Sequence, residues 1–167
     1  RVFKPTEVQM MLGAFSNTET IHIAAYSHLL DTIGMAEVEY SAFLEYEAMK
    51  DKFDYMRLWG VDSKEDIAKT LAVFGAFTEG LQLFASFAVL MNFPRQNRMK
   101  GMGQIVTWSV RDETLHTESA IKLFKTFIEE NPEVWNDKVK EEITNACSTV
   151  IEHEDAFINL AFELGGV

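Results

Sequence analysis

Long segments in which apolar residues recur at helical spacing are the feature of this sequence that most restricts its fold. The first such segment follows Pro5 and continues to about Leu30, with Gly34 as the expected stop. Alternating runs of β-branched residues extend over only a few positions, so strands are not expected. Glycine and proline are expected at the joints rather than inside the elements. The pattern predicts an all-α fold, a bundle of long helices.

Further helical segments are expected along the rest of the chain. Ser63 with Asp66 three residues later resembles a capping box, which opens an unusually apolar helix. Gly60 and the Asn131-Pro132 pair are expected to end the helices that precede them. A single helical domain is therefore predicted for residues 1–167. The expected helices cover about 37–59, 64–91, about 102–130, and one or two helices within about 133–164.

Composition excludes several kinds of protein. The 167 residues are 47% hydrophobic, which suits one domain with a sizeable core. A net charge of -11 argues against a nucleic-acid-binding surface. Cys147 is the only cysteine, so no internal disulfide can form and a reducing cytoplasm is expected. Polar residues interrupt the apolar runs before the roughly 20 residues of a membrane span, so no membrane is expected.

Two segments share the pattern Glu-x-x-His. Glu19 precedes His22, and Glu113 precedes His116, each within a predicted helix. Residues three apart on a helix lie on one face, so a carboxylate and an imidazole can hold one metal ion together. These ligands suit iron or manganese better than a thiolate-seeking metal. One such pair alone would more often be surface decoration, but two matched copies favour ligands. The apolar neighbours Ile21, Ile23, Ala24, Ala25, Val110 and Leu115 were expected to place both pairs in dry surroundings.

Glu79 is a third candidate ligand. It lies in the most apolar helix of the chain, between Phe74 and Phe84. A carboxylate buried without a partner is costly, and such groups are paired, bind metal or take up a proton. The alternative is that Glu79 points outward from an otherwise buried helix. Combined with the two Glu-x-x-His pairs, the ligand interpretation is favoured.

The order of these groups resembles that of ferritin-like dimetal-carboxylate bundles, in which a lone acid and a Glu-x-x-His pair alternate twice. The chain contains the last three of the four parts. The first lone acid is expected on a helix before Arg1, so the first ligand helix of the bundle is expected to be missing. Glu45 and Glu47 lie at the wrong place in the repeat and are interpreted as solvated residues.

Tyr26 lies four residues after His22, one turn along the same helix face. A phenol close to a metal pair that activates oxygen could lose one electron, and a dry pocket would protect the radical. From the spacing alone, an ordinary packed tyrosine with a hydrogen-bonded hydroxyl is the favoured interpretation.

These residues together resemble the small subunits of class I ribonucleotide reductases. The run Ser16-Asn17-Thr18-Glu19-Thr20-Ile21-His22, followed by Tyr26-Ser27-His28, is similar to the first Glu-x-x-His helix of that family. The run from Arg111 to His116 is similar to the second, where Arg-Asp-Glu-x-x-His is typical. Glu79 with Ser86-Phe87 resembles the intervening ligand helix.

The resemblance implies roles for individual residues. Tyr26 would hold the stable radical, and Asp112 would hydrogen-bond a ligand histidine on the radical-transfer route. Phe87 and Leu83 would line the radical pocket. The implied metal ligands are Glu19, His22, Glu79, Glu113 and His116, holding two irons, two manganese ions or one of each.

The resemblance also implies a function and partners. The family's small subunit passes a radical to a large catalytic subunit that reduces ribonucleotides to deoxyribonucleotides, and it usually forms a homodimer. The first aspartate ligand, the tryptophan after it and the docking tail have no match here. The chain is therefore expected to need a companion segment. The alternatives are another dimetal oxidase or peroxidase of the same bundle class, or a non-enzymatic acidic helical module.

Overall fold

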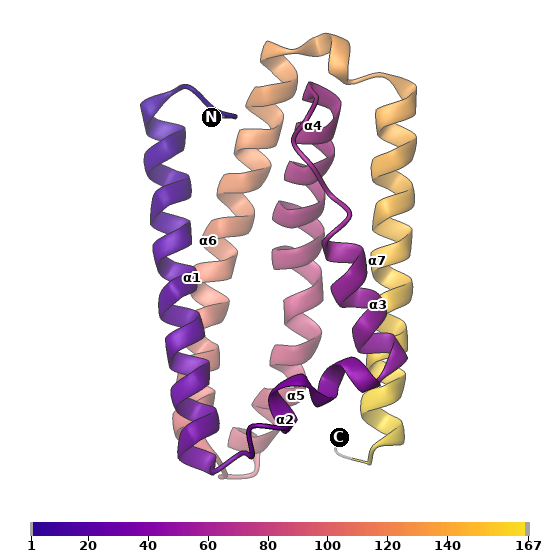
Figure 1. The fold of residues 1–167 in the computed structure, drawn as a ribbon. Coiled ribbons are helices and arrows are strands. Elements are labelled where there is room, and N and C mark those ends of the chain that lie inside the picture. Colours follow the sequence, from indigo (N-terminus) through magenta and orange to yellow (C-terminus); the bar gives the residue numbers. More distant parts are fainter. Residues whose placement is uncertain (1, 166–167) are drawn as a thin grey trace.

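The computed structural model describes residues 2–165, and every regular element within them is helical. Four long helical rods run side by side (Figure 1). Three of them are single α-helices: α1 (Thr6–Ile33), α6 (Lys100–Glu130) and α7 (Asp137–Glu163). The fourth is a composite rod of α4 (Lys64–Ala72), η2 (Val73–Gln82) and α5 (Leu83–Arg95). The prediction of an all-α, ferritin-like bundle is confirmed.

Several helix ends agree with the capping residues in the sequence. Gly34 closes α1 in the left-handed conformation at φ 74°, which glycine adopts without steric cost. The Ser63 hydroxyl accepts a hydrogen bond from the Asp66 amide at 3.0 Å and opens α4. Asn136 caps α7 in the same way, accepting from the Val139 amide at 3.1 Å. A short 3-10 turn, η3 (Pro132–Val134), separates α6 from α7.

The single helix predicted for about 37–59 is wrong. The chain instead forms α2 (Glu39–Ala42), a 3-10 turn η1 (Phe43–Glu45) and α3 (Glu47–Met56). Tyr46 is extended, at φ -88° and ψ 121°, and this residue breaks the helix without a glycine or proline. The break lets α2 cross the end of the bundle and α3 turn back along α7 (Figure 1).

The composite rod departs from a regular α-helix at η2, a π-helical segment of 10 residues. Two of its glycines face α6 at close range. A Cβ on Gly75 would collide with the Cβ of Ala120, and a Cβ on Gly80 would lie 3.1 Å from Cγ2 of Thr117. The expectation that glycine occurs only at joints is therefore wrong, because these two glycines let η2 approach α6 closely.

Proline also lies inside a helix. Pro94 belongs to the last turn of α5, which continues to Arg95, beyond the predicted end at residue 91. Its ring occupies the space where a side chain at position 103 would lie, since a Cβ on Gly103 would be 2.5 Å from Cγ of Pro94. The glycine thus makes room for the turn between α5 and α6.

The rod Lys64–Arg95 is long and apolar enough to cross a membrane by length and composition alone. A core helix of a soluble protein passes the same test. In this structure the rod packs against both α6 and α7, as a core helix does.

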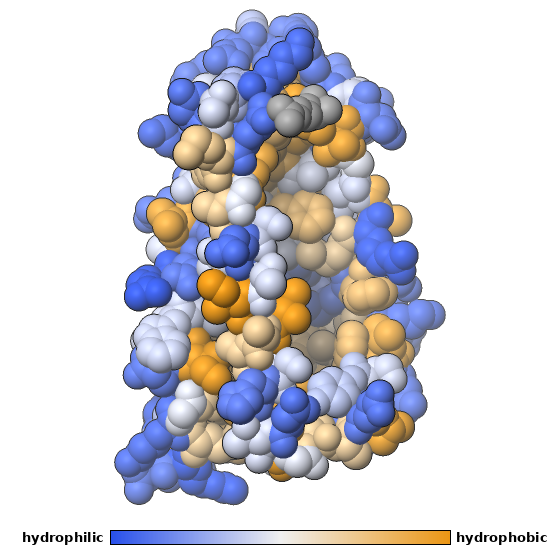
Figure 2. Space-filling model, turned by 60° about the vertical axis from the view of Figure 1, so that its left-hand side comes forward, coloured by the Kyte–Doolittle hydropathy of each residue, from blue (hydrophilic) through white to orange (hydrophobic). Residues whose placement is uncertain are grey.

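The core lies among the composite rod, α6 and α7, whereas α1 contributes no fully buried residue. Its exposed apolar side chains include Met10 and Ile23, at 69% and 71% exposure. Figure 2 shows the side of the molecule on which α1 lies, with hydrophobic side chains gathered around a recess. One long helix is therefore packed on one side only.

Candidate metal centre

The two Glu-x-x-His segments face each other across the contact between α1 and α6, which lie side by side (Figure 1). Nδ1 of His22 lies 3.1 Å from Oε1 of Glu113. Nδ1 of His116 lies 3.2 Å from Oε1 of Glu19 and 3.2 Å from Oε2 of Glu113. Ligand atoms of Glu19, Glu113 and His116 all fall within 4.8 Å of one another. Donor atoms bound to one ion at about 2.1 Å are about 3 Å apart, so these spacings suit a shared ion.

Asp112 faces one of the two ring nitrogens of His22 and favours a proton on it. Nε2 of His22 lies 3.3 Å from Oδ2 of Asp112, on the side of the ring away from Glu113. Burial raises the pKa of Asp112, but hydrogen bonds from His22 and Arg111 outweigh it and hold the pKa below its usual value. An ionised carboxylate only accepts, so this pairing favours a proton on Nε2 and a lone pair on Nδ1.

The lone pair on Nδ1 of His22 then points at two carboxylates. Glu113 Oε1 is 3.1 Å away and Glu19 Oε2 is 3.4 Å away. Electron pairs at this range repel unless a cation lies between them. Glu19 Oε1 is moreover buried, and its 3.2 Å contact with Nδ1 of His116 is not a hydrogen bond. The donor set, carboxylate oxygen with imidazole nitrogen, fits iron or manganese.

Glu79 reaches the same region from η2. It is half-buried and lines a cavity of about 130 Å³ together with Phe15 and Ala120. Burial, followed by the negative charges of Glu113 and Glu19, raises the pKa of Glu79 to about 7. Three carboxylates whose charges act on one another are thus gathered with two imidazoles.

Glu113 is the most enclosed of these acids, with 3% of its surface exposed. Burial and the charge of Glu19 raise its pKa, although His116 and His22 act in the opposite direction. Raised carboxyl pKa values mean that the cluster binds a positive charge, either a proton or a metal ion.

Tyr26 lies one turn beyond His22 on α1. Its hydroxyl is 3.0 Å from Oγ of Ser109, a residue with 2% exposure. Burial raises the pKa of the phenol, Ser109 lowers it, and the charge of Glu113 raises it further. The ring packs against the apolar cluster of Phe87, Met102 and Val106, and Leu83 packs against the same cluster. The phenol is therefore neutral and shielded by apolar side chains.

Sequence reasoning missed two residues of this region. Ser109 lies one turn before Glu113 on the inner face of α6, and its spacing could have indicated it. Phe15 lies one turn before Glu19 and places its ring 4.1 Å from that of His116.

The expected dry surroundings were wrong in part. Ile21, Ile23 and Leu115 are 59%, 71% and 59% exposed. They flank the motifs in sequence but project away from the cluster, because adjacent helical residues face different directions. The apolar wall comes instead from residues of α5 and α6.

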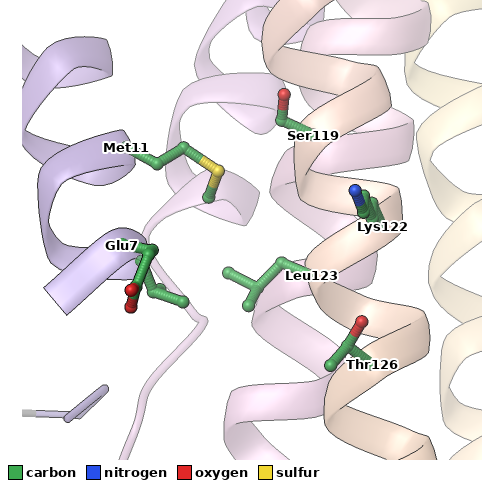
Figure 3. Close-up of a pocket in the computed structure, with 7 residues that line it drawn as sticks. Glu7, Met11, Ser119, Lys122, Leu123 and Thr126 are labelled. Carbon is green, nitrogen blue, oxygen red and sulfur yellow. The ribbon is translucent and has the colours of Figure 1, made fainter. Parts of the chain in front are cut away.

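A second cavity, of about 300 Å³, opens between α1 and α6 nearer the start of α1. Figure 3 shows Glu7 and Met11 of α1 facing Leu123 and Lys122 of α6 across it. Met11 and Leu123 also line the Glu79 cavity. The two cavities therefore adjoin and form one groove along α1, called the α1 groove below.

The sequence of the chain is similar to those of known proteins. The profile of the family "Ribonucleotide reductase, small chain" matches residues 1–167. A "Probable ribonucleoside-diphosphate reductase small subunit" of Invertebrate iridescent virus 6 is 45% identical over 96% of this chain and 50% of its own length. Its counterpart in Invertebrate iridescent virus 3 is 42% identical over 99% of this chain and 49% of its own length. A "Ribonucleoside-diphosphate reductase subunit beta" of Chlamydia pneumoniae is 30% identical over 81% of this chain.

The chain spans about half the length of these relatives. The profile nevertheless covers every residue of the chain, including both Glu-x-x-His segments and Glu79. The chain therefore belongs to the ribonucleotide reductase small-chain family.

Proposed function

We propose that this chain supplies most of the dinuclear metal site and the radical tyrosine of a ribonucleoside-diphosphate reductase small subunit. The observation that carries the proposal is the position of the two imidazoles. Nδ1 of His22 and Nδ1 of His116 each face carboxylate oxygens at 3.1–3.4 Å. Such an arrangement is stable only around positive charge.

The proposed ligands divide between three helices. Glu19 and His22 come from α1, and Glu113 and His116 from α6, while η2 contributes Glu79. We propose iron, manganese or one of each as the metals, since both accept carboxylate and imidazole ligands. When bound, the dinuclear centre supplies oxygen activation and the one-electron oxidation of Tyr26.

The protein's own residues orient and shield this chemistry. Asp112 accepts from Nε2 of His22 and so keeps Nδ1 free as a ligand. Ser109 fixes the phenol of Tyr26 through a hydroxyl contact of 3.0 Å and can hold its proton in place. Phe87 and Leu83 form part of the apolar wall that excludes water. Radical transfer through Asp112 towards the large subunit is part of the same proposal.

We further propose that a companion segment outside residues 1–167 fills the α1 groove and adds the sixth ligand, an aspartate. Bundles of this class take one acid from each of two helices and a Glu-x-x-His from each of two others. Within residues 2–165, Glu79 is the one lone acid that adjoins the two pairs, and it lines the groove. The apolar groove side chains Met11, Leu12, Phe74 and Leu123 suit a helix with one apolar face.

The partners and the cellular location proposed for this chain are those typical of the family. We propose a large catalytic subunit as the recipient of the radical, a homodimer of small subunits, and a cytoplasmic location. The substrates, ribonucleoside diphosphates, would bind the large subunit, so this chain alone would not reduce them. No role with nucleic acid is proposed, in keeping with the net charge of -11.

Electron paramagnetic resonance of the iron-loaded, air-exposed protein tests the proposal, with the companion segment present. A tyrosyl radical signal is expected in the wild type. Tyr26→Phe should keep the metal content and lose the signal, whereas Tyr40→Phe, on α2, should retain it. A signal that survives Tyr26→Phe would refute the role of Tyr26. Bound metal without any tyrosyl signal would favour another dimetal oxidase or peroxidase, and absence of stoichiometric metal would favour a non-enzymatic module.

A further inference from the structure

Thr78, the residue immediately before Glu79, has an unusual hydrogen-bond partner. Its hydroxyl donates to Sδ of Met56 at 3.1 Å. Met56 is the last residue of α3, so the bond joins α3 to the π-helical segment η2. The contact is partly buried, where a hydroxyl without a partner would be costly.

Six threonines elsewhere in the long helices behave differently. Their hydroxyls donate to the backbone carbonyl four residues earlier in the same helix, as threonine commonly does. These six are Thr18, Thr20, Thr32, Thr107, Thr114 and Thr144. By contrast, Thr70 of α4 donates to the Gly60 carbonyl, and the buried Thr117 hydroxyl has no hydrogen-bond partner within the described part of the chain. Within η2 the backbone is wound more widely, and π-helical segments are frequent at functional sites. Thr78 therefore links the π-helical turn that carries Glu79 to α3 and does not bond within η2.

Helix α3, which carries Met56, is held against α7 by a buried ion pair. Lys52 of α3 forms an ion pair with Glu154 of α7, and their side chains are only 13% and 7% exposed. The Lys52 ammonium also lies 4.6 Å from the centre of the Phe157 ring. A buried charge pair tolerates little displacement, since either charge alone would be unpaired away from water.

An aromatic contact fixes the same helix a second time. The ring of Tyr55 meets that of His153 edge-on, with centroids 5.2 Å apart. Met56 follows Tyr55 directly and lies one turn beyond Lys52. The part of α3 that carries Met56 is thus held against α7 by contacts of Lys52 and Tyr55 that do not involve η2.

We propose that Met56 is a positioning residue for the metal centre. Contacts with α7 hold α3 in place, and the Met56 sulfur holds Thr78 so that the π-helical turn directs Glu79 towards Glu113 and Glu19. The inference rests on the proposed function, since Glu79 must be a ligand for its position to affect the metal. If the sulfur merely satisfied a hydroxyl, removing it would change stability and leave the metal's coordination unaltered.

Cobalt(II) is a suitable probe, because its visible absorption spectrum reports coordination geometry and its titration gives affinity. The test compares Met56→Leu, which removes the acceptor at nearly constant volume, with Thr78→Val, which removes the donor. Met49→Leu, the other methionine of α3, and Thr114→Val, a threonine that also adjoins a proposed ligand, serve as matched controls. These four variants, the Met56→Leu/Thr78→Val double variant and the wild type are each titrated in the presence of the companion segment.

Each of Met56→Leu and Thr78→Val should weaken cobalt binding about 5-fold, as expected for one ordinary hydrogen bond, and shift the spectrum. The double variant should be no worse than either single variant, because both remove the same bond. The controls should match the wild type.

Wild-type affinity and spectrum in both test variants would overturn the positioning role while leaving the metal site intact. A wild type that binds no cobalt would overturn the proposed function itself, so the two failures are distinguishable. If Met56→Leu folds poorly, Thr78→Val alone tests the proposal.

Discussion

Nε2 of His22 lies 3.3 Å from Oδ2 of Asp112, while the opposite side of the ring faces the carboxylate cluster. The two residues are 90 positions apart and come from α1 and α6. Through this contact Asp112, which lies outside the cluster, favours the His22 tautomer that can bind a metal through Nδ1. This orienting role of Asp112 can be tested by metal affinity, without measuring activity.

Asp112→Asn should weaken metal binding by about 10- to 100-fold, the usual effect of removing a carboxylate that orients a ligand histidine. An asparagine amide can donate as well as accept, so it no longer enforces a proton on Nε2. Manganese(II) titration followed by electron paramagnetic resonance measures the affinity. Glu141→Gln, an exposed acid on α7, is the control and should bind as the wild type does. Equal affinity in Asp112→Asn and the control would contradict this role.

The raised pKa of Glu79 predicts that the free energy of unfolding of the metal-free protein depends on pH. Burial and the charges of Glu113 and Glu19 raise its pKa from 4.5 to about 7 in the folded state. A carboxyl group with a raised folded pKa stabilises the fold below its unfolded pKa and loses that contribution as the pH rises through 7. The free energy of unfolding of the wild type, relative to Glu79→Gln, should therefore fall between pH 5 and pH 8. Urea denaturation in the presence of a chelator measures it, and a difference that stays constant with pH would count against the shifted pKa.

Gly75→Ala should destabilise the protein by about 1–3 kcal/mol, since the added methyl group would overlap Ala120 and force η2 away from α6. Ala120→Gly, combined with Gly75→Ala, should recover part of the loss by making room. Gly13→Ala is the matched control: a Cβ there meets nothing within 4 Å, so alanine should be neutral or stabilise α1 by up to about 1 kcal/mol. Urea denaturation distinguishes these outcomes, and equal effects at positions 75 and 13 would argue against the close helix contact.

Lys52→Met should cost about 3–5 kcal/mol, because it leaves the Glu154 carboxylate buried without its partner. Replacing both residues, as Lys52→Met with Glu154→Leu, should restore most of the stability. Lys138→Met removes an exposed i,i+4 pair with Glu142 and should change stability by no more than about 0.5 kcal/mol. Chemical denaturation of the three variants measures the difference, and a small loss in Lys52→Met alone would mean that the pair is solvated.

Helix ends and motif spacing were predictable because they depend on local chemistry. Gly34 and Ser63 cap helices for reasons contained in a few neighbouring residues. The extended conformation of Tyr46 was not predictable in this way, because it serves the crossing of α2 over the bundle end rather than any local preference. The π-helical winding of η2 was not predictable either; Gly75 and Gly80 allow its close approach to α6, which is a contact between distant parts of the sequence.

The candidate site, too, combines features that local spacing predicts with features that depend on how the helices pack. Spacing placed Glu19 with His22 and Glu113 with His116 on common helix faces, and the structure brings both pairs together. The surroundings could not be inferred from sequence neighbours, as the exposed Ile23 shows. The spacing of Ser109 from Glu113 places both on one face of α6, but the contact between Ser109 and the Tyr26 hydroxyl depends on the packing of α1 against α6.

In the proposed metal centre, carboxylates and imidazoles from α1, η2 and α6 surround two metal ions. Anomalous X-ray diffraction from crystals of the iron-loaded protein, recorded above and below the iron absorption edge, tests this arrangement most directly. Two adjacent iron peaks are expected, bounded by Glu19, His22, Glu79, Glu113 and His116. Iron-replete crystals without anomalous density among these side chains would contradict it.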